Sequence, residues 1–169
     1  MKDTSQMRQL CRLNFHVEGF RDTWGHCDQL ANYLSRAISF GRPDPFTFAN
    51  LISAVLNEVF EIIYCHSKPD GFVAMGIYDD GGELLLDAII PAGDQEQAFY
   101  SETVSDVTSG NASKRFLELL NDSESLTREI GFYELAADYA AKLDFEVTAD
   151  GDAHLQISAS MLQFEGVAQ

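Results

Sequence analysis

The segment best equipped to do chemistry is 56–67, with the sequence LNEVFEIIYCHS, which places an amide, two carboxylates and an imidazole on an apolar background. Residues four apart share one face of a helix, and oxygen ligands are what Mg²⁺ prefers. Glu58 is therefore a candidate catalytic base, although the residue four positions later is Ile62, which offers no oxygen to a cation. Asn57 and Glu61 are also four apart. The alternative for Glu58 is a solvated or partner-facing carboxylate.

Other catalytic arrangements find no support in the sequence. Asp22 and His26 belong to no recognisable Ser-His-Asp pattern, and no nucleophile elbow, P-loop or dinucleotide-binding fingerprint occurs. The three cysteines are widely spaced without a C-x-x-C pair, so we expect reduced, largely buried thiols and no metal site. His66 ends the 56–67 segment and is interpreted as a helix-end cap in preference to a phosphoacceptor.

Composition indicates one globular domain. The 169 residues are 46% hydrophobic with a formal charge of −16, enough apolar content for a core and enough negative charge to disfavour nucleic acid and anionic membranes. We expect a single domain over 1–169, with 1–10 as a flexible N-terminus. The start of the chain has no apolar signal region and no uninterrupted apolar run reaches membrane-spanning length, which predicts a cytoplasmic protein.

Hydrophobic periodicity predicts an α+β fold, a two-layer sandwich in which helices cover one face of a mixed, mostly antiparallel sheet. The sequence DDGG at 79–82 reads as a hairpin turn between two apolar strands. The expected strands span 11–17, 72–78, 83–90, 144–149 and 154–161. The expected helices span 20–39, 46–67, one or two within 94–128, and 129–143.

Several of these features together resemble the histidine-kinase-like (Bergerat-type) ATPase superfamily. Glu58 and the His-Ser that ends 56–67 are similar to its N-box helix, and IGFYEL at 130–135 is similar to its Gly-x-Gly-Leu box. Trp24 and CDQLANYL at 27–34 resemble small bacterial single-domain regulators related to anti-sigma-factor serine kinases, which work alongside partner-switching proteins. The resemblance covers nearly the whole chain, and it implies a nucleotide site.

The sequence boxes that would form this nucleotide site lack several of the residues that the family uses. An isoleucine holds the position of the Asn that binds Mg²⁺ in the family, leaving Glu58 as the matching carboxylate. The second box keeps one glycine, Gly93, after Pro91, which lacks a backbone donor. The last box keeps Gly131, but Glu129 stands where its first glycine would be and would compete with phosphate for the helix N-terminus. We therefore expect no cofactor, with weak ATP/Mg binding as the alternative.

The apolar periodicity predicts an intact core, whereas the residues expected in a nucleotide site are missing. This combination favours a non-catalytic signalling regulator that binds proteins. The expected partners are an anti-sigma-factor antagonist, a phosphatase or a response regulator. The alternative is an atypical serine/threonine kinase that uses Glu58 as its base, with Gly131 near the phosphates. A homodimer and a different ligand in the vestigial cleft also stay open. Phe99, Tyr100 and Phe116 are candidates for core packing or for the partner surface.

Overall fold

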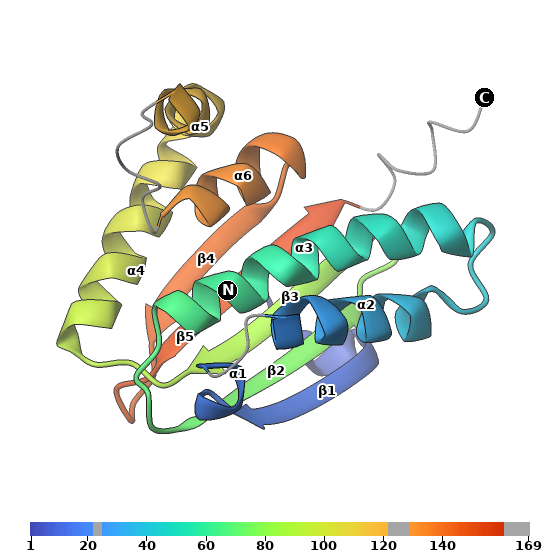
Figure 1. Cartoon of the computed structure of the whole chain (residues 1–169), viewed down its shortest axis with the longest axis horizontal. Coiled ribbons are helices and arrows are strands. Elements are labelled where there is room, and N and C mark those ends of the chain that lie inside the picture. The colour runs from blue at the N-terminus through green and yellow to red at the C-terminus, as the bar shows by residue number, and fades with distance from the viewer. Residues whose placement is uncertain (22–24, 122–128, 161–169) are drawn as a thin grey trace.

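The computed structural model describes residues 1–21, 25–121 and 129–160. Its five strands form one sheet in the order β1-β2-β3-β5-β4, and each neighbouring pair is antiparallel. The elements in chain order are η1 (Thr4–Gln6), β1 (Arg8–His16), α1 (Glu18–Arg21), α2 (Gly25–Ser39), α3 (Pro45–Cys65), β2 (Phe72–Asp79), β3 (Glu83–Ile90), α4 (Asp94–Asp106), the π-helical turn η2 (Val107–Asn111), α5 (Ala112–Asn121), α6 (Ile130–Asp138), β4 (Lys142–Val147) and β5 (Ala153–Ser160). Helices α2, α3 and α6 lie over one face of the sheet (Figure 1). The predicted two-layer α+β sandwich is confirmed, with a wholly antiparallel sheet where a mixed one was expected.

Alternation along the strands builds the core. Val73, Met75 and Ile77 of β2 point into the helical layer, and the equivalent alternate positions of β3 and β5 are also buried. The predicted hairpin joins β2 to β3. Its turn is possible because Gly81 and Gly82 adopt positive φ values of 66° and 136°, a conformation that costs glycine little.

Helix α3 is the central element of the helical layer. Asp44 caps it by accepting a hydrogen bond from the Thr47 backbone N–H at 3.1 Å, and Pro45 occupies the first turn, where its missing N–H is harmless. Among the described residues, α3 is one helix whose length and apolar composition would allow it to cross a membrane. Its apolar side chains instead pack against α2 and the sheet, and residues such as Leu56 and Phe60 are fully buried. We therefore interpret α3 as a core helix.

The predicted helices and their observed limits differ at two places. The helix predicted at 20–39 is two helices, and Trp24 lies between them, outside the described residues. The helix predicted at 129–143 ends at Asp138, because Ala140 adopts a positive φ of 48° and the Ala141 N–H bonds back to the Leu135 carbonyl at 3.0 Å. Strand β4 follows directly. An alanine gives no sequence signal for this left-handed helix end.

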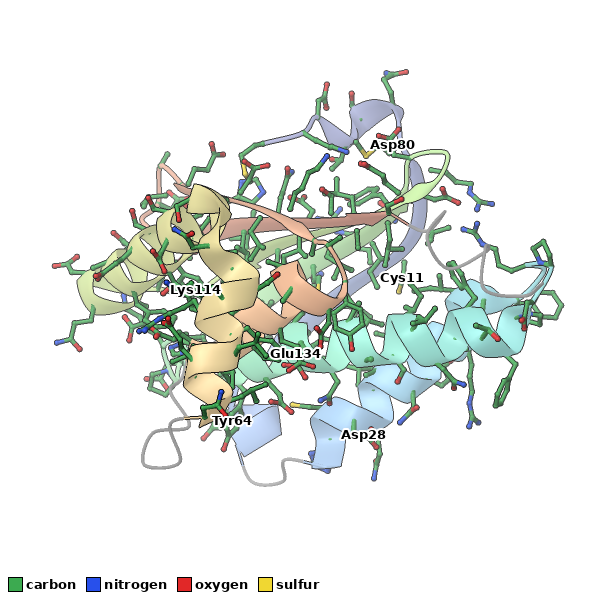
Figure 2. The ribbon with its side chains drawn as sticks, turned by 90° about the horizontal axis from the view of Figure 1, so that it is seen from above. Cys11, Asp28, Tyr64, Asp80, Lys114 and Glu134 are labelled. Carbon is green, nitrogen blue, oxygen red and sulfur yellow. The ribbon has the colours of Figure 1, made fainter. Side chains whose placement is uncertain are left out.

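The N-terminal segment, which was expected to be flexible, makes specific contacts with the sheet. Strand β1 starts at Arg8, three residues before its predicted beginning. The Lys2 backbone N–H donates to Gln156 Oε1 at 2.6 Å, and Gln156 Nε2 donates to the Lys2 carbonyl at 3.0 Å. Lys2 Nζ also bonds Glu83. These contacts place the segment on the face of the sheet away from α2 and α3 (Figure 2).

Candidate functional site

Helices α3 and α6 meet where the resemblance predicted a nucleotide site. Gly131, in the first turn of α6, is buried against the middle of α3. A Cβ at Gly131 would lie 3.1 Å from Glu58 Oε2 and 3.4 Å from Ile62 Cγ1. The structure therefore brings Glu58 and Gly131 together, with the side chains of Glu58 and Ile62 directly against the glycine.

This helix crossing is acidic. Glu58 is half-buried, and burial, followed by repulsion from Glu134 and Glu61, raises its pKa to about 7. Burial also raises the pKa of Glu61 and of Glu134. Figure 2 shows Glu134 where α6 passes over α3. A polyphosphate placed here would meet several carboxylates, and this contact is unfavourable without a compensating cation.

The described residues supply no such cation at Glu58. No ion pair recorded for residues 1–21, 25–121 and 129–160 includes Glu58. Within the same ranges, no group of three or more His, Cys, Asp or Glu residues is arranged to hold a metal ion. Ile62, one helical turn after Glu58 and also against Gly131, offers no oxygen to a cation.

The N-terminus of α6 is also unsuited to phosphate. Glu129 is the N-cap residue, and its carboxylate lies 3.5 Å from Arg115 of α5. A carboxylate at this end already interacts favourably with the helix dipole and would repel a second anion. The competition between Glu129 and phosphate stays a prediction.

Gly93 lies at a different place. It is the N-cap of α4, where its N–H donates to Glu96 Oε2 at 2.8 Å, and a Cβ there would lie 2.9 Å from Lys68 Cε. Lys68 follows the C-terminal end of α3, whereas Glu58 is seven residues before the last residue of that helix, roughly 10 Å along its axis. The structure thus separates Gly93 from the pair Glu58 and Gly131.

The aromatic residues of α4 and α5 belong to the core. Tyr100 is 0% exposed, Phe116 is buried and Phe99 packs against the same cluster. His66 is the C-cap residue of α3, as predicted, and its ring stacks on Phe99 with centroids 3.8 Å apart. Of the three cysteines, which form no disulfide, Cys65 is exposed where a buried thiol was expected.

One acidic group at the crossing escaped the sequence interpretation. Glu134 lies on α6 three residues after Gly131, so helical spacing could have placed both on the face that meets α3. The neighbours of Glu134 in the sequence are mostly apolar, so Glu134 was not selected as a site residue. Nothing in the sequence could show that α6 crosses α3 beside Glu58 and not elsewhere along the helix.

Comparison with known proteins gives one informative result. No family model and no curated protein matches the sequence. A chain in the crystal structure of the SiaB-SiaC complex from Pseudomonas aeruginosa is similar in structure, with a TM-score of 0.60 and 14% sequence identity over 92% of this chain and 92% of that one. The likeness shows a shared fold.

Proposed function

We propose that this chain is a non-catalytic signalling regulator that acts by binding another protein. One observation carries the proposal: the space beside Gly131 is filled by the side chains of Glu58 and Ile62. A fold that keeps its core but packs protein side chains where the resemblance implied a nucleotide leaves the surface as the place for function. The proposal needs no cofactor.

The shared fold supports a role in a partner-switching or two-component pathway. The similar chain comes from a crystal structure of a complex between two named proteins, SiaB and SiaC. By analogy, we propose a protein partner of the same general kind: an anti-sigma-factor antagonist, a phosphatase or a response regulator. We also propose a histidine-kinase-like ancestry for the fold and a cytoplasmic location.

The charge distribution indicates what the partner surface should be. Residues 1–50 hold six basic and five acidic side chains, whereas residues 51–169 hold five basic and twenty-two acidic ones. A partner that docks on the acidic part should present a basic face, because complementary potentials speed encounter and select partners. The same acidity argues against nucleic acid and anionic membranes as partners.

Titration calorimetry with ATP and ADP, with and without Mg²⁺, tests the non-catalytic part of the proposal. We expect no binding heat at millimolar nucleotide. Mixing the purified protein with regulators encoded beside it in its genome, followed by gel filtration, tests the binding part. Micromolar, Mg-dependent nucleotide binding would contradict the first part, and the absence of any complex at micromolar concentration would contradict the second.

A second candidate function is an atypical serine/threonine kinase, and one observation favours it. A carboxyl group with a pKa of about 7 is suited to accept a proton at neutral pH, and Glu58 has this pKa. The kinase hypothesis predicts that Glu58→Gln abolishes phosphate transfer to a protein substrate while Glu61→Gln retains it. Equal activity of the two variants would show that Glu58 is not the catalytic base.

A further inference from the structure

An aromatic patch lies at the end of the molecule where α2 is joined to α3. Tyr33, Phe40 and Phe46 are 71%, 92% and 76% exposed. Phe40 and Phe46 line the same groove, and Tyr33 lies about two helical turns before Phe40, which directly follows the last residue of α2. Single exposed apolar residues are ordinary on protein surfaces, but a contiguous group is typical of an interaction site.

A groove runs beside these aromatic side chains. It has a volume of about 380 Å³, and its walls include Phe40, Pro45, Phe46 and Ala49, with Arg36 as the charged residue among its lining. Phe40 projects into solvent beside this hollow. The same small surface thus offers a protruding ring and a recess, which is the arrangement that a two-fold interface between identical chains requires.

Local charge distinguishes this patch from the rest of the molecule. Arg36 lies in the groove and Asp44 caps α3 next to it, and these two charges are of opposite sign. Arg42 is already paired with Asp79 at 2.7 Å. The acidic helix α4 lies at the opposite end of the molecule from the α2–α3 connection (Figures 1 and 2).

From these observations we propose that the patch of Tyr33, Phe40 and Phe46 is the core of a homodimer interface, with a second copy of this chain as its occupant. Two copies that each carry a charge of −16 repel one another. Contact through the near-neutral end keeps the acidic parts of the two copies away from the interface, which lessens this repulsion. Arg36 of each copy is free to approach Asp44 of the other across the two-fold axis.

The available area suits a reversible dimer. An aromatic side chain buries roughly 150–250 Å², so three mostly exposed rings offer roughly 400 Å² of apolar surface to a partner. A stable interface buries about 800 Å² per partner, with an apolar centre and a polar rim. The patch supplies the centre, and the exposed side chains of Arg36 and Asn50 in the groove lining supply polar groups for the rim. This proposal does not depend on the proposed signalling function.

Sedimentation velocity over protein concentrations from about 1 to about 100 μM tests the proposal, since a dimer of micromolar affinity populates both monomer and dimer in this range. We expect a monomer–dimer equilibrium that Phe40→Ala and Phe46→Ala each weaken about tenfold or more. Added NaCl should strengthen the dimer, because salt screens the repulsion between two acidic chains.

Phe72→Ala is the matched control. Phe72 is 68% exposed and is the first residue of β2. The patch is near the other end of this strand, where Asp79 is paired with Arg42. This control should leave the dimer unchanged. A protein that stays monomeric up to the highest concentration would overturn the proposal, and so would a dimer that Phe40→Ala and Phe46→Ala leave intact. Unchanged urea unfolding of both variants would show that the loss of dimer is not a loss of folding.

Discussion

Glu58 and Gly131 are in contact, although seventy-three residues separate them in the sequence: a Cβ at position 131 would lie 3.1 Å from Glu58 Oε2. The glycine allows α6 to approach α3 closely enough to cover the carboxylate. The contact therefore sets how closely the two helices pack at this crossing.

Gly131→Ala should be better tolerated when Glu58 is shortened. Alanine is favoured over glycine in a helix by about 1 kcal/mol, but its Cβ would press on Glu58 Oε2 and lie 3.4 Å from Ile62 Cγ1. In a Glu58→Ala background only the contact with Ile62 remains. We expect Gly131→Ala to be about 1 kcal/mol more favourable in that background than in the wild type, as measured by urea unfolding in a double-mutant cycle.

Gly19→Ala serves as the control for helix propensity, because a Cβ at Gly19 of α1 meets nothing within 4 Å. Its effect should be the same with and without Glu58→Ala. A coupling energy near zero between positions 58 and 131 would show that the side chain of Glu58 moves away without cost.

The elevated pKa of Glu58 predicts a pH dependence of stability. The folded protein holds the Glu58 proton up to a pH of about 7, whereas the unfolded chain releases it near 4.5. The folded state therefore binds more protons in this interval, and stability falls as pH rises through it. We expect Glu58→Gln to match the wild type at low pH and to exceed it at pH 8 by about 1–2 kcal/mol, after allowance for solvent screening.

Urea unfolding at pH 5, 6, 7 and 8 would measure this dependence. Glu102→Gln, a change of an exposed carboxylate on α4, is the control and should leave the pH profile of the wild type unchanged. A free energy of unfolding of the wild type that increases steadily from pH 5 to pH 8 would contradict a raised pKa of Glu58 in the folded protein.

Much of the fold was predictable because hydrophobic periodicity reports burial directly. The core stripe of α3 and the β2–β3 hairpin follow from local patterns: apolar residues at helical spacing, and a DDGG turn between two apolar runs. The end of α6 was not predictable. It depends on Ala140 in a left-handed conformation, which tertiary packing imposes on a residue that favours helices.

The candidate site was only partly predictable. That Ile62 cannot coordinate a cation is visible in the sequence, since the residue type alone excludes coordination. The crossing of α3 and α6 beside Glu58 is a long-range contact with no local signal. The aromatic patch also escaped prediction, because the exposure of Phe40 depends on the connection between α2 and α3 turning away from the core.

Asp79 should contribute to stability through two arginines. Its Oδ2 accepts hydrogen bonds from Arg8 at 2.6 Å and from Arg42 at 2.7 Å, which join β1 and the α2–α3 connection to the hairpin. Burial raises the pKa of Asp79, but these hydrogen bonds and charges outweigh it and lower the pKa overall. The stabilisation is therefore present above a pH of about 4 and is lost as the pH falls further.

We expect Asp79→Asn to cost about 1–2 kcal/mol at pH 7 and to cost less at pH 3, as measured by chemical denaturation. Asp80→Asn on the same hairpin is the control, because Asp80 is more exposed and its ion pair with Lys2 spans 3.8 Å. Its effect at pH 7 should be below about 0.5 kcal/mol. Equal costs for the two variants would show that the double arginine contact adds nothing.

Two buried tyrosines should respond in opposite ways to loss of the hydroxyl. Tyr100 is 0% exposed, and its hydroxyl has no hydrogen-bond partner among the described residues. The hydroxyl of Tyr133 donates to the carboxylate of Asp106. A buried polar group without a partner costs free energy, whereas a satisfied one contributes about 1 kcal/mol.

Tyr100→Phe should therefore leave the free energy of unfolding unchanged or raise it by up to about 1 kcal/mol, and Tyr133→Phe should lower it by about 1 kcal/mol. Urea unfolding of both variants under identical conditions checks this contrast, because each removes one oxygen from a tyrosine in the same core. A loss of more than 1 kcal/mol in Tyr100→Phe would show that the Tyr100 hydroxyl forms a stabilising hydrogen bond in solution.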